Sequence, residues 1–154
     1  MNQKILDDLK KLKTVYYEEK DVKIGDALTL KLKPLTSEEE TDSHAYAMTY
    51  ERGLSYLFAL KRDTLCKAII SLNGQDLPEI IEDNEIKDTE GKPEKTQRHL
   101  WIRKNIVKGW NQELVDTIWN HYKTLMDGIE TKIHGNVIVG KLDAVVSEIL
   151  DKKE

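Results

Sequence analysis

The segment 28–40, with the sequence LTLKLKPLTSEEE, constrains the fold most, because it predicts a strand that leads directly into a helix. The alternation of apolar and polar residues, typical of a half-buried strand, is carried by Leu28, Leu30 and Leu32. Pro34 cannot donate to a sheet ladder, so we expect this strand to lie at a sheet edge or to end there. Thr36 or Ser37 is expected to cap the helix, and the glutamates that follow suit the positive end of its dipole.

The composition indicates one folded domain, residues 1–154, with a polar surface: 39% of the residues are hydrophobic and 34% are charged. A net charge of -4 argues against general nucleic-acid binding. No apolar run reaches the roughly 20 residues of a membrane span, and acidic residues stand near the N-terminus where a signal peptide would be apolar. The single cysteine, Cys66, excludes an internal disulfide. We therefore expect a soluble intracellular protein without a membrane segment.

The N-terminal part predicts a short helix followed by strands. Residues 1–13 form a helical arm whose apolar face is made by Ile5, Leu9 and Leu12. Residues 14–35 favour a β element, a hairpin or a small meander, with a turn at 24–27.

The middle of the chain, residues 36–77, is predicted to be helical. Apolar residues recur mostly at threes and fours from Ala45 to Leu72. Gly53 leaves open whether this segment is one helix or two, since an interior glycine costs about 1 kcal/mol relative to alanine. Asn73 and Gly74 then supply a turn that accepts positive φ.

The segment 78–95 is charged, thinly apolar and broken by Gly91 and Pro93, so we expect a loop or mobile connector. Residues 96–154 are expected to form the C-terminal helices. One runs over about 96–108, and a second, with the clearest apolar face, follows an N-cap at Asn111.

A final amphipathic helix is expected near the C-terminus, where the apolar residues are spaced by four, three and four: Ile138, Leu142, Val145 and Ile149. The predicted fold is mostly α with a small N-terminal β-hairpin or meander, an α+β class, and the helices are expected to form a bundle.

No pattern of catalytic or metal-ligating residues stands out. The four histidines and Cys66 are scattered and lack the spacing of zinc ligands. Cys66 adjoins an apolar helical stripe, where free cysteine is usually a small hydrophobe. Nucleophile-elbow and phosphate-loop sequences are absent. We expect a protein that is not an enzyme and that carries neither metal nor cofactor.

The two terminal helices are short and marginal alone, so each is expected to dock, on its own domain or on another chain. The candidate contact residues are Ile5, Leu9 and Leu12 at one end and Ile138, Leu142 and Val145 at the other. Trp101 and Trp110 complete the candidate interaction residues, because an exposed tryptophan is a common interface anchor.

The segment 92–108 mixes cations with tryptophan: Lys92, Lys95, Arg98, His99, Arg103, Lys104 and Lys108 surround Trp101 and Trp110. A small nucleic-acid-associated factor could use such a segment. Acidic residues precede it heavily, however, and a solvated basic face is the simpler interpretation. Electrostatic contact with an acidic protein partner is an equally good functional use.

Three segments resemble the tail assembly chaperones and baseplate-hub assembly proteins of tailed bacteriophages. The first is KPLTSEEE at 33–40, the second is the helix-then-turn sequence at 64–77, and the third is the helical sequence at 110–125. With the chain between them they cover about half of the sequence, in the order that the family shows. The motifs are loose hydrophobic patterns.

The resemblance implies a role without catalysis, in the host cytoplasm during assembly. Such proteins bind tape-measure, tube or hub proteins and prevent premature association, and some relatives remain in the tail or baseplate of the virion. The charged connector and the lysine-rich N-terminus have no match in that family. No binding residue of the family is carried over.

Overall fold

The computed structural model describes residues 2–50, 53–87 and 89–134, which belong to two compact units. The larger unit is 19–123, and the smaller one comprises the chain ends, of which 2–18 and 124–134 are described. The elements of the larger unit are β1 (Lys20–Ile24), β2 (Leu28–Leu32), α2 (Ser37–Ala47), α3 (Leu54–Ala68), β3 (Ile69–Leu72), β4 (Gln75–Asp76), β5 (Ile80–Lys87), β6 (Pro93–Gln97), α4 (Arg98–Asn105) and the 3-10 turn η1 (Val107–Gly109).

A four-stranded antiparallel sheet has the order β1-β2-β3-β4. The hairpin predicted around the turn at 24–27 is confirmed, with Val22 opposite Leu30. Leu30 and Leu32 are buried and Thr29 is exposed, as the alternation predicts. Of the two alternatives predicted from Pro34, the structure shows the second: β2 ends before Pro34 and is an inner strand, because β3 pairs with its other side. A proline placed after the last ladder bond does not restrict pairing.

The junction between β2 and α2 carries a complete capping box. Thr36 Oγ1 accepts from the Glu39 backbone N–H at 3.2 Å, and the Glu39 carboxylate accepts from the Thr36 N–H at 3.0 Å. Burial alone would raise the pKa of Glu39, but hydrogen bonds from the Lys33 ammonium and the Thr36 backbone outweigh burial, so the pKa lies below its ordinary value. The carboxylate therefore stays ionised and holds the helix start.

Replacing Thr36 with alanine is expected to lower the free energy of unfolding by about 0.5–2 kcal/mol, because the first turn of α2 loses its side-chain acceptor. Urea unfolding measures this. The matched control is Ser37→Ala at the next, exposed position, with an expected change within about 0.5 kcal/mol. Equal losses in the two variants would contradict the capping role.

The helical segment after Thr36 is two helices, α2 and α3, so Gly53 marks a break. Gly53 has φ of +86°, a conformation that other residues rarely adopt, and it directly precedes α3. The prediction that the helix extends through Leu72 is wrong, because residues 69–72 form β3. Apolar spacing suited a helix there, but the β-branched Ile69 pairs with Leu32 of β2.

The turn predicted at Asn73 and Gly74 is confirmed and joins β3 to β4. Both residues have positive φ, +49° and +81°. Asn73 also ties the turn to β2, since its Oδ1 accepts from the Thr29 N–H at 2.8 Å and its own N–H donates to the Thr29 carbonyl at 2.7 Å.

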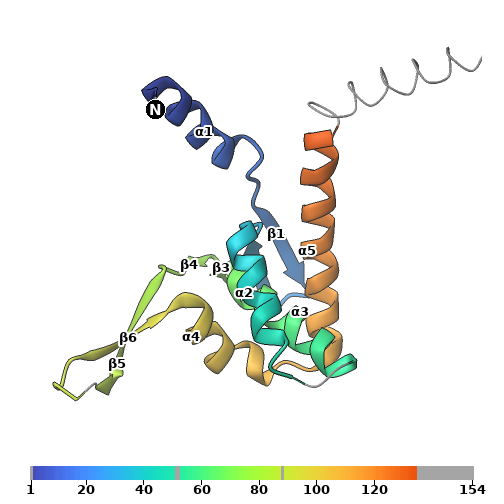
Figure 1. Cartoon of the computed structure of the whole chain (residues 1–154). Helices are drawn as coiled ribbons and strands as arrows, with labels where there is room; N and C mark the ends of the chain where they lie inside the picture. Colours follow the sequence, from blue (N-terminus) through green and yellow to red (C-terminus); the bar gives the residue numbers. More distant parts are fainter. Residues whose placement is uncertain (1, 51–52, 88, 135–154) are drawn as a thin grey trace, which may run out of the picture. The chain divides into compact units, whose positions relative to one another are not determined.

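The prediction of a loop or mobile connector at 78–95 is wrong, because residues 80–87 and 93–97 form the antiparallel strands β5 and β6, a ribbon that leads into α4 (Figure 1). Ile80 pairs with Gln97 and Glu82 with Lys95, whose side chains form an ion pair at 3.7 Å. Backbone pairing and cross-strand charges thus hold a segment that is poor in apolar residues.

The helix expected over 96–108 is shorter: α4 spans Arg98–Asn105 and η1 follows it. The next helix is α5 (Gln112–Ile133), and Asn111 caps it, since its Oδ1 accepts from the Leu114 N–H at 2.9 Å. The apolar face predicted for α5 is confirmed by the buried residues Val115, Ile118, Tyr122, Leu125 and Ile129.

In the smaller unit, the predicted N-terminal helix is α1 (Gln3–Val15), which includes Thr14 and Val15, both expected to be in a strand. The described part of the chain is an α+β fold with more strand than predicted. A helical bundle is not confirmed, because α3 packs against β3 as well as against α2 and α4.

Candidate functional site

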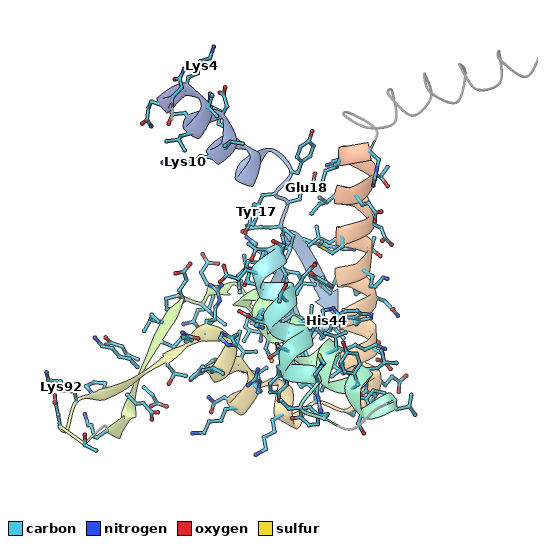
Figure 2. The ribbon with its side chains drawn as sticks, viewed as in Figure 1. Lys4, Lys10, Tyr17, Glu18, His44 and Lys92 are labelled. Atoms are coloured by element: carbon cyan, nitrogen blue, oxygen red, sulfur yellow. The ribbon has the colours of Figure 1, made fainter. Side chains whose placement is uncertain are left out.

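The predicted interaction residues lie in different settings. On α1, Ile5 and Leu9 are 50% and 53% exposed, and Leu12 belongs to the same helix with its side chain outside the described part. Trp101 on α4 and Trp110 after η1 are half-buried. The C-terminal candidates Ile138, Leu142 and Val145 lie outside the described residues. Figure 2 shows Lys4 and Lys10 on α1, among the polar side chains of this helix.

A buried charge cluster joins α2, α3 and α4. The Asp63 carboxylate pairs with the Arg103 guanidinium and, at 2.8 Å, with the Lys67 ammonium. Lys67 also donates to Ser43 Oγ at 2.9 Å. Burial alone would raise the pKa of Asp63, but these partners outweigh it and hold the pKa below its ordinary value. The cluster is an internally paired structural element.

Cys66 directly precedes Lys67 of this cluster and is fully buried. Burial raises the pKa of its thiol to about 12. The thiol therefore stays protonated near neutral pH, and only the thiolate is a strong nucleophile or metal ligand.

Outside the charge cluster, α3 and α4 enclose a pocket of about 370 Å³, which we call the α3–α4 pocket. Its aromatic wall is formed by Tyr46 and Tyr50, whose hydroxyls are 2.8 Å apart and whose rings meet edge to face at 5.5 Å. The Arg103 guanidinium lies 4.2 Å from the centre of the Tyr46 ring. Burial and the hydrogen bond to Tyr50 raise the pKa of Tyr46, so its hydroxyl stays protonated at neutral pH.

The charged wall of this pocket contains four cations and one carboxylate: Arg62, Arg103, Lys104, Lys108 and Asp63. Asp63 is already paired with Arg103 and Lys67. Arg62, Lys104 and Lys108 are exposed, and within the described ranges no carboxylate pairs with them. Leu100, 40% exposed, adds an apolar surface beside them. The pocket thus offers free positive charge next to aromatic and aliphatic side chains.

The basic segment 92–108 does not form one cationic face. Lys92 and Lys95 have carboxylate neighbours, Glu90 and Glu82, each at 3.7 Å. Arg98 donates to the Leu77 carbonyl at 3.0 Å, and Arg103 pairs with Asp63. In Figure 2, Lys92 lies at the far end of the β5–β6 ribbon. Of the cations in this segment, Arg103, Lys104 and Lys108 line the α3–α4 pocket.

Sequence reasoning missed Arg62, Tyr46 and Tyr50 as site residues. Tyr46 and Tyr50 are four residues apart, as are Lys104 and Lys108, a spacing that would place each pair on one side of a continuous helix. In the structure α2 ends at Ala47 and α4 at Asn105, so neither pair lies on one helix. Arg62 gave no such signal, because only the packing of α3 against α4 brings it to the same pocket. Neither Trp101 nor Trp110 lines the pocket.

A second pocket, of about 490 Å³, lies between the start of α2 and the start of α4. Its cations are bound to the fold: Lys33 pairs with Glu39 at 2.8 Å, Lys67 with Asp63, and Arg98 with the Leu77 carbonyl. Burial and the nearby Lys67 charge lower the pKa of His99, which also lines this pocket. These bonded side chains are better suited to holding the strand and helix ends together.

Large apolar side chains are exposed where α2 ends and α3 begins, a surface we call the α2–α3 corner. Its residues and exposed fractions are Met48 at 73%, Tyr50 at 40%, Leu54 at 68% and Leu57 at 46%. Tyr50 belongs to both the corner and the α3–α4 pocket. Four large apolar side chains exposed this close together in the sequence make the corner a candidate interaction surface.

Among residues 2–50, 53–87 and 89–134, there is no group of three or more histidine, cysteine or acidic side chains that could hold a metal ion. The helices in the same ranges include none that is both long and apolar enough to cross a membrane.

Comparisons with models of known protein families, with curated proteins and with solved structures found no match to this chain.

Proposed function

We propose that this chain is a phage tail or baseplate assembly protein that works without catalysis, by contact with tape-measure, tube or hub proteins in the host cytoplasm. The observation that carries the proposal is the α2–α3 corner, where methionine, tyrosine and leucine side chains face solvent. Aromatic residues and methionine are enriched at protein interfaces, and exposed leucines add apolar area.

The three segments that resemble the assembly proteins support the same proposal. Residues 33–40 begin directly after strand β2, which ends at Leu32, and contain the capped start of α2. Residues 64–77 run from α3 through β3 and the Asn73–Gly74 turn, and 110–125 cover the first half of α5. These segments flank the corner in sequence, and the first two contain the start of α2 and the end of α3, the helices between which the corner lies.

The chemistry of the buried polar side chains also favours a binding role. Asp63, Lys67 and Ser43 are bonded to one another or to Arg103, and Cys66 is buried with a raised pKa. Such groups stabilise a fold rather than act on a substrate. The free cations of the α3–α4 pocket are surface groups suited to electrostatic contact.

The test is an affinity pull-down of the tagged full chain from infected-cell lysate, with identification by mass spectrometry. Recovery of tape-measure, tube or hub proteins is expected. Leu54→Glu with Leu57→Glu should reduce this recovery on the order of tenfold, because two apolar anchors become charged. Both leucines are exposed, so folding should be unaffected.

The matched control is Ile80→Glu, which charges a side chain that is 51% exposed on β5, outside the corner. It should retain the same tail proteins as the unmodified chain. Recovery of no tail protein by the unmodified chain would overturn the proposed function. If the Leu54→Glu, Leu57→Glu variant recovered as much tail protein as the unmodified chain, the corner would not be the contact surface. Stable presence in purified particles would identify a structural virion component instead of a released chaperone.

A further inference from the structure

We infer that the α3–α4 pocket binds an acidic segment of the partner protein, one that carries carboxylates next to an apolar side chain. The inference rests on the proposed function and adds the chemistry of the partner. Its basis is the juxtaposition of free cations with Leu100 and two tyrosines in one pocket.

The charges of the pocket are unbalanced within the described part of the chain. Arg62 lies on α3, Lys104 on α4 and Lys108 on η1. All three side chains are exposed and line the same pocket. The one carboxylate of the wall, Asp63, is 1% exposed and bonded to Arg103 and Lys67. It cannot neutralise the outer cations without giving up these partners. A ligand that supplies carboxylates would complete the pocket.

The apolar parts of the pocket define the rest of the ligand. Leu100 is 40% exposed beside the cations, and Tyr46 and Tyr50 form an aromatic wall whose rings meet edge to face and whose hydroxyls are hydrogen-bonded to each other. A peptide that alternates carboxylates with aliphatic residues matches both kinds of surface. The volume of about 370 Å³ is large enough for side chains of such a peptide, within the range of roughly 300–1,000 Å³ typical of ligand pockets.

An acidic protein segment suits this pocket better than nucleic acid. Binding to a phosphate backbone needs a broad basic surface, whereas this chain has a net charge of -4. Lys92 and Lys95, which would extend the basic surface, have carboxylate neighbours. The other cations of segment 92–108 that face this part of the fold, Arg103, Lys104 and Lys108, line one pocket together with Leu100. This arrangement favours short carboxylate-rich sequences.

The test measures the fluorescence anisotropy of a labelled peptide of alternating glutamate and leucine, titrated with the full chain. Binding is expected to weaken as salt rises, and the matching peptide of glutamine and leucine should bind much more weakly. Arg62→Glu with Lys108→Glu should weaken binding of the acidic peptide on the order of tenfold or more. The control is Lys123→Glu, an exposed lysine on α5 outside the pocket, which should bind like the unmodified chain.

Each outcome has a defined meaning. Absence of binding to the acidic peptide, equal binding by the double variant, or tighter binding of single-stranded DNA in the same assay would overturn the inference. The double variant is also used in the pull-down. If it recovers tail proteins undiminished, the inference fails while the proposed function stands. If the unmodified chain recovers no tail protein, the proposed function fails independently of the peptide result.

Discussion

Replacing Asp63 with asparagine is expected to lower the free energy of unfolding by about 3–5 kcal/mol, the largest effect among the substitutions considered for this chain. The Asp63 carboxylate is 1% exposed and pairs with both Lys67 and Arg103. The amide has nearly the same shape but no charge. It would leave the Lys67 ammonium, which is 9% exposed, without a counterion in the core. Urea unfolding at neutral pH measures the loss.

The matched control is Asp116→Asn. Asp116 accepts from Lys61 Nζ at 3.0 Å and from Gln112 at 3.0 Å, but its carboxylate is exposed and screened by water. The unfolding midpoint of this variant should stay close to that of the unmodified chain. If Asp63→Asn were no more destabilising than Asp116→Asn, the buried cluster would not hold α3 and α4 together.

The same cluster predicts how stability depends on pH. The pKa of Asp63 in the fold lies below its ordinary value of 3.8, so the unfolded chain takes up a proton first as the pH falls. The stabilisation due to the Asp63 carboxylate is therefore complete above the unfolded-state pKa of 3.8. It is lost as the pH falls below 3.8 towards the lower pKa of the folded state. Glu39 acts in the same direction. The Asp63→Asn variant should lose part of this acid sensitivity and keep the part due to Glu39.

Replacing Leu65 with alanine is expected to cost about 2–5 kcal/mol, the second large effect. Leu65 has no exposed surface and lies near the end of α3, the helix that packs against α2, α4 and β3. The substitution removes buried methyl groups and leaves a cavity that the surrounding helices fill only in part. Urea unfolding measures the change, with the same dependence of the unfolding free energy on urea concentration used for both proteins.

The control for this prediction is Leu57→Ala on the same helix, where the leucine is 46% exposed. Its expected change is within about 0.5 kcal/mol, since little apolar area leaves water at this position on folding. The two variants differ only in burial, so a comparable loss in both would mean that α3 does not present its Leu65 side to the core.

Sequence reasoning succeeded where the determining interactions are local. The β2–α2 junction is set by the alternation of leucines and by the Thr36–Glu39 capping box, all within a few residues. The Asn73–Gly74 turn and the Asn111 cap are equally local, because positive φ and a side-chain acceptor depend on residue type. The apolar face of α5 follows from periodicity alone.

It failed where a distant partner decides the structure. The spacing of apolar residues around Ile69 fits a helix. The segment is a strand because its backbone pairs with β2, which is distant in the sequence. The ribbon β5–β6 is built from backbone pairing between charged segments, which leaves little apolar pattern. The α3–α4 pocket was beyond prediction for the same reason: Arg62 meets Lys104 and Lys108 through helix packing.

The remote end of the β5–β6 ribbon makes the chain suitable for site-selective labelling. The native thiol, Cys66, is enclosed in the core and has a pKa of about 12, so it is inert towards maleimides at neutral pH. A thiol introduced by Lys92→Cys would then be the only reactive one, 74% of the lysine side chain being exposed at present. A dye at that position reports on tumbling and assembly from a point outside the sheet β1–β4.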